Sequence, residues 1–155
     1  MSQPSLLPQE RKVEAIRNGT VIDHIRAGRG TILLKALSLV SGDRVISAGL
    51  NFKSKMFGKK DIVKIEDHEL TKDDLARIAV ISPGATVNVI RDYVVAEKSC
   101  PAIPDEIRGL SKCPNPNCIT RSEPMTPHFL ITKTDNAQLR CRYCEKLFTF
   151  ADLDF

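Results

Sequence analysis

Four cysteines near the end of the chain constrain its folding more than any other feature. Cys113 and Cys118 flank the tetrapeptide "PNPN", and Cys141 and Cys144 are separated by two residues, so the spacing is C-x4-C-x22-C-x2-C. Two closely spaced pairs, each on a tight turn, are typical of a tetrahedral site in which four thiolates bind one zinc ion. Four thiolates fill the coordination shell and leave no position for water. We therefore expect one structural zinc per chain rather than a catalytic one.

Other chemistries of cysteine fit the pattern less well. The N-terminal stretch "MSQPSLLPQERK" lacks the apolar core of a secretory signal, which predicts a cytoplasmic, reducing location where disulfides are rare. An iron–sulfur cluster uses similar ligands but is less typical of this spacing. A redox-active pair requires one exposed thiol of low pKa, and this interpretation would leave the second pair of cysteines unexplained. The fifth cysteine, Cys100, lies outside the set, and we assign it no role.

Composition sets only broad limits on function. The chain has 155 residues, 42% of them hydrophobic, which is typical of one or two small globular domains. The net charge of +4 is compatible with an anionic ligand or with nucleic acid, but the charges are spread along the chain and do not choose between them. No apolar run is long enough to cross a membrane, so we expect no membrane partner.

Residues 13–99 alternate between the periods of strands and helices. The order strand, helix, strand, strand, helix, strand predicts an α+β fold of the ferredoxin-like, split βαβ type. One face of such a sheet is covered by two helices, and the other remains for a partner or ligand. The expected strands are 13–25, 43–52, 59–67 and 85–99, and the expected helices are 31–40 and 71–84.

This periodicity predicts which residues cap the helices and which side chains face the core. Thr31 is placed to cap the first helix, and Thr71 with Asp74 forms a capping-box pattern at the second. The expected core-facing residues are Leu33, Ala36, Leu37 and Val40 on the first helix, Ile46, Ala48, Leu50 and Phe52 on one strand, and Val63 and Ile65 on the next.

The chain divides into four parts. Residues 1–12 are expected to be a flexible N-terminus, 13–99 the first domain and 100–110, with two prolines and a glycine, a linker. Residues 111–155 form a small antiparallel β module that is too poor in apolar residues to fold without its cysteines as a staple.

No catalytic constellation stands out. The sequence lacks a Gly-rich phosphate loop ending in Lys-Ser or Lys-Thr, an HExxH motif and a Ser/His/Asp order, so its pattern offers no credible catalytic set. Lys60 and Lys64 share an expected strand, and Lys98 ends another. Lysines of this kind are usually solvated and unrelated, and the alternative is a shared anion site.

Five motifs together suggest a family. "VEAIRNGTVIDHI", "GKKDIVKIE", "ATVNVIRDYVV", "CPNPNCI" and "CRYCEK" closely resemble the regulatory chain of bacterial aspartate carbamoyltransferase, and the match is collinear from Val13 to Phe150. The resemblance implies a non-catalytic chain of pyrimidine biosynthesis. Its first domain would bind nucleotides, with CTP and UTP inhibiting and ATP activating. Its zinc domain would dock onto the catalytic chain, and regulatory chains would pair as homodimers.

The resemblance also implies roles for single residues. Asp23 and His24 match the motif "IDHI" and would contact the nucleotide, with His24 near the phosphates, Lys98 on phosphate and ribose, and Lys64 near base and ribose. The base pocket would be lined by Val13, Glu14, Ala15, Ile16 and Val21, and its walls by Lys60, Ile62, Asn88, Tyr93 and Val95. Asn115, Asn117 and Glu145 would face the catalytic chain.

Two observations bear on this interpretation. The stretches "RAGRGTILLKA" and "FKSKMFG" depart from the better-known members of the family. An alternative of another class is a nucleic-acid-binding zinc ribbon, suggested by the four cysteines and the basic charge. That alternative predicts stacking aromatic rings beside the metal site, and residues 111–155 offer few; we expect no nucleic-acid partner.

Overall fold

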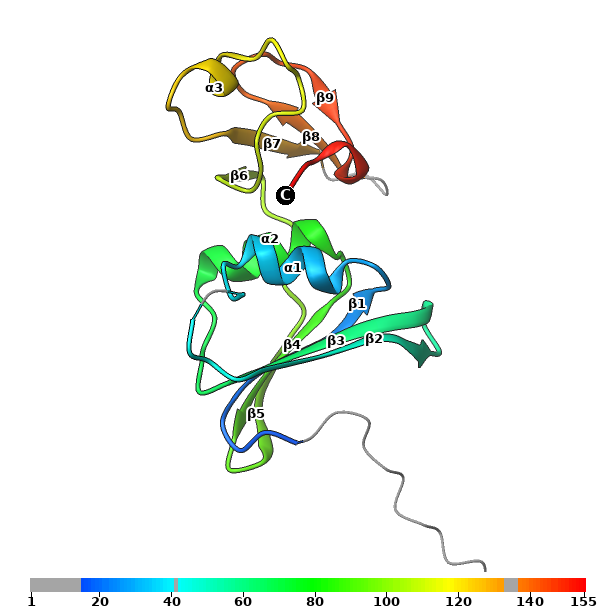
Figure 1. The fold of residues 1–155 in the computed structure, drawn as a ribbon. Helices are drawn as coiled ribbons and strands as arrows, with labels where there is room; N and C mark the ends of the chain where they lie inside the picture. Colours follow the sequence, from blue (N-terminus) through cyan, green and yellow to red (C-terminus); the bar gives the residue numbers. More distant parts are fainter. Residues whose placement is uncertain (1–14, 41, 133–136) are drawn as a thin grey trace, which may run out of the picture.

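Two β-sheets and the short helices around them make up the structure, a computed structural model that describes residues 15–40, 42–132 and 137–155 (Figure 1). The first sheet has five strands in the order β2-β3-β1-β4-β5, and the second has four in the order β6-β7-β8-β9. The first domain contains β1 (Gly19–Arg26), α1 (Gly30–Ala36), β2 (Ile46–Ser54), β3 (Gly58–Glu66), α2 (Lys72–Ile81), β4 (Thr86–Arg91) and β5 (Val94–Ser99).

The first domain confirms the ferredoxin-like prediction. Its strands are all antiparallel to their neighbours, and β1 lies between β3 and β4, as two split βαβ units require. The single strand expected over 85–99 is two strands, because a turn at Asp92 and Tyr93 divides it, and the second of them, β5, extends the sheet through a hairpin from β4. The two helices lie between this sheet and the second domain, so the opposite face of the sheet points away from that domain (Figure 1).

The core of the first domain lies between the sheet and the two helices. Leu33 of α1, together with Ile78 and Ile81 of α2, is fully buried and belongs to the same cluster as Ile22 and Val63 of the sheet. The alternation predicted for β3 is confirmed, since Val63 and Ile65 are both fully buried.

Helix α2 starts at its predicted cap. The Thr71 hydroxyl accepts a hydrogen bond from the Asp74 backbone N–H, and the Asp74 carboxylate accepts one from the Thr71 N–H. This reciprocal capping box satisfies two backbone donors that the first turn of a helix leaves without partners.

The prediction for the first helix was wrong in three respects. The helix begins at Gly30 and ends at Ala36, its N-cap is Arg29, and Thr31 forms no cap. Leu37 is buried, but Val40 is 69% exposed because the chain has left the helix before it. The helical spacing of apolar residues continues in the sequence past the end of the helix, and this is why the helix was predicted to be longer than it is.

A β-bulge in β2 explains where the predicted alternation of this strand fails. Opposite Ile62–Lys60 of β3, the strand β2 has one residue more, and Asn51 there adopts a left-handed φ of 60°. The extra residue reverses the side on which later side chains lie. Leu50, predicted to face the core, is 47% exposed at this bulge. Ala48, for which the same prediction was made, is exposed before the bulge, on what is an edge strand of the sheet.

The second domain is smaller and its sheet is antiparallel. It contains β6 (Glu106–Arg108), α3 (Ile119–Ser122), β7 (His128–Thr132), β8 (Gln138–Cys141), β9 (Leu147–Phe148) and the 3-10 turn η1 (Phe150–Asp152). Strand β6 lies within the expected linker 100–110 and pairs with β7, with Ile107 buried. None of the helices in the described ranges is both long and apolar enough to cross a membrane.

Candidate functional site

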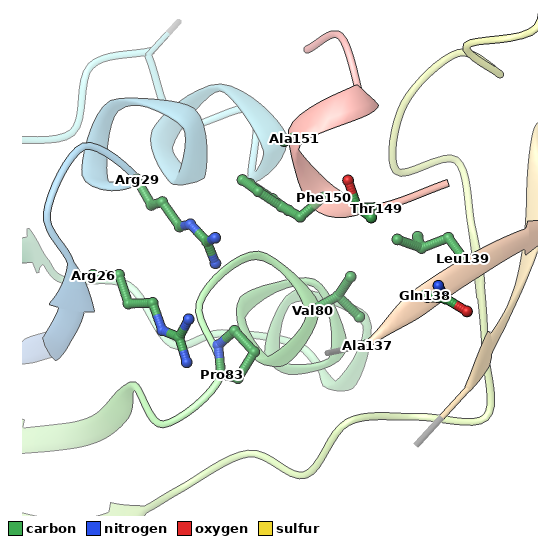
Figure 2. A pocket seen from close by; sticks show the side chains of 10 residues that line it. All are labelled: Arg26, Arg29, Val80, Pro83, Ala137, Gln138, Leu139, Thr149, Phe150 and Ala151. Carbon is green, nitrogen blue, oxygen red and sulfur yellow. The ribbon is translucent and has the colours of Figure 1, made fainter. Parts of the chain in front are cut away.

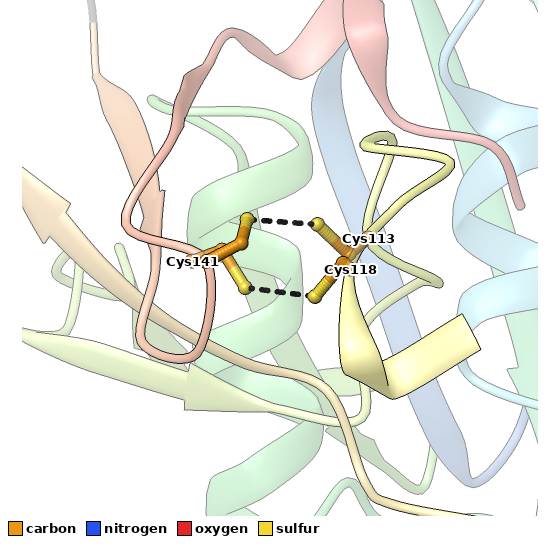
Figure 3. A group of neighbouring side chains, drawn as sticks. Cys113, Cys118 and Cys141 are labelled. Carbon is orange, nitrogen blue, oxygen red and sulfur yellow. Dashed lines mark hydrogen bonds between the residues drawn. The ribbon is translucent and has the colours of Figure 1, made fainter. Parts of the chain in front are cut away.

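The four cysteines of the predicted metal site meet in the second domain. Their sulfur atoms all lie within 4.8 Å of one another, and three of the four residues are buried. Figure 3 shows these three, Cys113, Cys118 and Cys141, with their sulfur atoms directed toward one another. Cys113 Sγ is 3.7 Å from Cys144 Sγ, and Cys118 Sγ is 3.8 Å from Cys141 Sγ. Four ligands at about 2.3 Å from a tetrahedral zinc ion would be about 3.8 Å apart, whereas a disulfide requires about 2.05 Å. The cluster therefore has the dimensions of a metal site.

Two tight turns bring the sulfur atoms together. In the first turn, the Asn115 carbonyl accepts a hydrogen bond from Cys118 N–H at 3.1 Å. In the second, Cys141 ends β8 and its carbonyl accepts from Glu145 N–H at 2.8 Å. Glu145 has a left-handed φ of 63°, which closes this turn. The second turn continues directly from the sheet, whereas the first lies outside it, between β6 and α3.

The surroundings of the thiols indicate how they would bind a cation. Burial raises the pKa of the Cys113 and Cys141 thiols. Burial acts in the same sense on Cys144, but hydrogen bonds from the Lys146 backbone and the Asn115 side chain outweigh it and lower its pKa to about 7. Buried thiols that are reluctant to ionise alone become thiolates when a metal ion replaces their protons. The Thr120 hydroxyl donates a further hydrogen bond to Cys118 Sγ at 3.1 Å.

The uncovered face of the first sheet carries most of the predicted nucleotide-binding residues. The strand register places Lys64 opposite Val21, Val21 opposite Asn88, and Asn88 opposite Lys98. Side chains directly opposite each other lie on the same face, and the buried neighbours Ile22 and Val63 point to the helices. These four residues thus form one row across β3, β1, β4 and β5.

A bulge in β1 places Asp23 and His24 beside this row. Ile22 pairs with Val63 and Ile25 with Asp61, so β1 has one extra residue between them, and His24 adopts a left-handed φ of 55°. Asp23 Oδ1 accepts from His24 N–H at 2.6 Å, and His24 Nδ1 lies 3.0 Å from the Thr86 hydroxyl. Bulges of this kind re-aim side chains and are frequent at functional sites.

Lys60 joins the same group through an ion pair. Its ammonium nitrogen lies 2.9 Å from Asp23 Oδ1, and both side chains are largely buried. Burial raises the pKa of Asp23, but the hydrogen bond and charge of Lys60 and the N–H of His24 outweigh it, so this pKa lies below its ordinary value. Asp23 is therefore an anion that holds Lys60 in place at the edge of the row.

The remaining predicted nucleotide residues lie around this face or outside it. Ala15 is exposed and Ile16 buried just before β1, whereas Val13 and Glu14 lie outside the described residues. Ile62 lies on β3 between Lys60 and Lys64. Tyr93 and Val95 are exposed on the β4–β5 hairpin, and Tyr93 N–H donates to the Arg17 carbonyl at 2.9 Å.

The predicted contact residues differ from one another in exposure. Asn117 and Glu145 are exposed beside the cysteines. Asn115 is buried, and its Oδ1 accepts a hydrogen bond from Asn117 N–H at 3.1 Å. Together with its hydrogen bond to Cys144, this gives Asn115 a role inside the metal-binding turn, while its contact with a partner stays a prediction.

Sequence reasoning missed three residues that hold these sites. Thr86 positions His24, Thr120 donates to Cys118, and the fully buried Asp61 accepts N–H groups from both sides of the β1–α1 turn and from the bulge of β2. Only the position of Asp61 among the alternating apolar residues of "KKDIVKIE" signals a buried carboxylate.

Comparison with known proteins extends over nearly the whole chain. The family described as "Aspartate carbamoyltransferase regulatory chain, allosteric domain" matches residues 11–101. Its counterpart, "Aspartate carbamoyltransferase regulatory chain, metal binding domain", matches residues 105–154.

Individual relatives carry the same name. The aspartate carbamoyltransferase regulatory chain of Methanothermobacter thermautotrophicus is 43% identical over 148 residues, which cover 95% of this chain and 95% of the relative. The regulatory chain of Cronobacter sakazakii is 49% identical over 138 residues, covering 88% and 90%. The one from Methanocaldococcus jannaschii is 49% identical over 138 residues, covering 89% and 92%. With an allosteric domain before a metal-binding domain, the chain belongs to the family of aspartate carbamoyltransferase regulatory chains, the non-catalytic subunits of that enzyme.

Proposed function

We propose that this chain transmits nucleotide levels to the catalytic chain of aspartate carbamoyltransferase. CTP, and UTP with it, would inhibit, and ATP would activate, all from one site on the uncovered face of the first sheet. A structural zinc ion would hold the second domain in the shape that docks onto the catalytic chain. The observation that carries the proposal is the row of Lys64, Val21, Asn88 and Lys98, because it combines cationic, amide and apolar groups on a face free of helices.

The chemistry of this row suits a nucleotide that lies across the strands. Neighbouring strands are about 4.8 Å apart, so Lys64 and Lys98 are separated by three spacings, about 14 Å, at the backbone. Lysine ammonium groups bind phosphate as point charges, and the Asn88 amide can donate to and accept from a base or ribose. His24 and Lys60 lie at one side of the row, where their side-chain N–H groups would donate hydrogen bonds to the phosphates.

Zinc is the metal that we infer for the cysteine cluster. All four donors are thiolates, the sulfur separations fit a tetrahedron, and soft ligands in this geometry select zinc over calcium or magnesium. With every ligand position taken, the ion would have no catalytic role. It would instead supply folding free energy to a domain with few apolar residues.

Exposed apolar side chains on the second domain support its role in docking. Ile119, Tyr143 and Leu147 are 50%, 43% and 51% exposed, and they flank the two cysteine turns together with the exposed Asn117 and Glu145. Apolar and aromatic side chains with a polar rim are typical of a protein interface. We assign this surface to the catalytic chain.

A homodimer of regulatory chains is the other assembly that we propose. Strand β2 lies at one edge of the five-stranded sheet, and its outer backbone groups pair with no described strand. Such an edge is a template for pairing with a second copy. The alternative of a nucleic-acid-binding zinc ribbon explains none of the residues in the row.

Lys98→Ala is expected to weaken CTP and ATP binding alike, by about tenfold or more, because a charge-assisted hydrogen bond contributes about 1.5–3 kcal/mol. Lys98 is exposed on β5, so its removal should leave the fold intact. Calorimetric titration of the full chain with each nucleotide measures the two affinities.

Lys72→Ala is the matched control, since Lys72 is also exposed but opens α2 on the helix side of the sheet. Its nucleotide affinities should equal those of the parent chain. A loss for CTP alone in Lys98→Ala would show that Lys98 distinguishes bases, and unchanged affinities for both would remove it from the site.

A further inference from the structure

A cavity of about 340 Å³ lies between the two domains, and none of the residues that line it belongs to the row that we assign to nucleotides (Figure 2). One wall comes from the β1–α1 turn and the end of α2, with Arg26, Arg29, Val80 and Pro83. The other comes from the second domain, namely 137–139 and Thr149 to Ala151. The cavity therefore contacts both domains at once.

Arg29 is fixed at this cavity by contacts with both walls. Its Nη1 donates to the Ile81 carbonyl at the end of α2 at 2.7 Å, and its guanidinium lies 4.2 Å from the centre of the Phe150 ring of η1. Burial, and with it the charge of Arg26, lowers the pKa of Arg29. The guanidinium is thus held in place while several of its N–H groups remain available.

Arg26 extends into the same space from the end of β1. Figure 2 shows its side chain and that of Arg29 both directed toward Pro83. The Arg26 guanidinium also lies 5.8 Å from the centre of the Phe57 ring, at a neighbouring cavity that Lys59 helps to line. Three cationic side chains therefore follow one another along the two adjoining cavities.

No carboxylate of the described residues forms an ion pair with either arginine. Two acids of the adjoining segments are engaged elsewhere. Asp152 of η1 accepts from the Thr149 N–H and hydroxyl in a capping box, and Asp61 accepts from the N–H groups of Gly28 and Gly30. Two neighbouring guanidiniums without a counter-ion attract an anion that carries at least two charges.

We propose that this inter-domain cavity binds a compact oligophosphate anion, with Arg29 and Arg26 as its ligands and Lys59 at its outer end. The planar fork of arginine matches phosphate oxygens with two parallel hydrogen bonds. The volume admits one or two phosphate groups beside the apolar side chains of Leu139 and Phe150. Because both domains supply walls, the bound anion fixes them to each other. The site is independent of the nucleotide site proposed above, and both arginines lie in a stretch where the sequence departs from better-known members.

Inorganic pyrophosphate is a suitable probe, titrated calorimetrically into the full chain. Saturable binding is expected in the parent chain and in Lys98→Ala, and it should weaken about tenfold or more in Arg29→Gln and in Arg26→Gln. Arg44→Gln removes the same charge from an exposed position outside the cavity and should bind like the parent chain.

The variants distinguish binding between the domains from binding at the nucleotide row. Arg29→Gln also loses a hydrogen bond to the backbone and a contact with a ring. The side chain of Arg26 makes no hydrogen bond with the described residues, so Arg26→Gln tests the site with less effect on packing. If CTP competes with pyrophosphate for binding to Lys98→Ala, the occupant of the cavity is the phosphate tail of a nucleotide. If CTP does not compete, the occupant is a free anion. Binding unchanged in Arg26→Gln, binding lost only in Lys98→Ala, or no saturable binding would each overturn the proposal.

Discussion

Cys113→Ala and Cys141→Ala are each expected to unfold the second domain and to abolish assembly with the catalytic chain. Either change removes one of four sulfur ligands that lie within 4.8 Å of one another, and the two residues belong to different turns of the cluster. Structural zinc contributes about 10–16 kcal/mol to the folding of small domains, far more than a few apolar side chains can replace. The first domain buries Ile22, Leu33, Val63 and Ile78 between its own sheet and helices and should keep its structure.

Cys100→Ala is the matched control, because Cys100 is an exposed free thiol outside the cluster. Metal content, measured by elemental analysis, should be one zinc per chain in this control and about zero in the two ligand variants. Backbone amide exchange should rise across β7 and β8 only in the ligand variants. Normal co-purification of Cys113→Ala with catalytic chains would show that the metal is dispensable for docking.

Asp61→Ala should lower the free energy of unfolding of the first domain by about 3 kcal/mol or more. The Asp61 carboxylate is fully buried, and it accepts N–H groups from Gly28 at 3.1 Å, Gly30 at 3.0 Å and Asn51 at 2.9 Å. The Gly30 N–H is a buried donor, which costs about 1–3 kcal/mol when it is left without a partner, and the two part-buried bonds to Gly28 and Asn51 add to the loss. The loss should open the β1–α1 turn and the bulge of β2 together.

Denaturation of the full chain followed by amide exchange measures this effect, since the two domains need not unfold as one unit. The amides of Gly28, Gly30 and Asn51 should lose protection first. Asp43→Ala, an exposed acid in the turn before β2, should change stability by less than about 0.5 kcal/mol. Equal stability of Asp61→Ala and Asp43→Ala would show that the carboxylate does not hold these segments.

The elements that could be predicted are those in which local chemistry and periodicity agree. The Thr71–Asp74 capping box starts α2 as expected, and the alternation around Val63 and Ile65 places β3 in the core. The cysteine spacing was sufficient to predict the four-sulfur cluster, because two short turns can bring four sulfur atoms together in only a few ways. The order of these elements then gave the ferredoxin-like fold.

The bulges could not be predicted, and they shape the candidate site. A bulge changes the side on which residues lie through a single extra residue. The segment "IDHI" contains no glycine or proline to signal it, and the one glycine of "GLNF", Gly49, does not fix where the extra residue falls. Asp61 stabilises the bulge of β2 from the next strand, β3, ten residues further along the chain. The row of Lys64, Val21, Asn88 and Lys98 likewise depends on the register of four strands, and the sequence alone linked these residues only through the family resemblance.

The most direct test of the account is the activity of catalytic trimers assembled with this chain, measured with and without each nucleotide. The account predicts that the two chains co-purify, that saturating CTP lowers aspartate carbamoyltransferase activity, and that ATP raises it. Both responses should shrink in assemblies that contain Lys98→Ala and persist in those that contain Lys72→Ala. Activity that neither nucleotide changes, in an assembly that has formed and contains its metal, would contradict the claim that this chain carries a nucleotide signal.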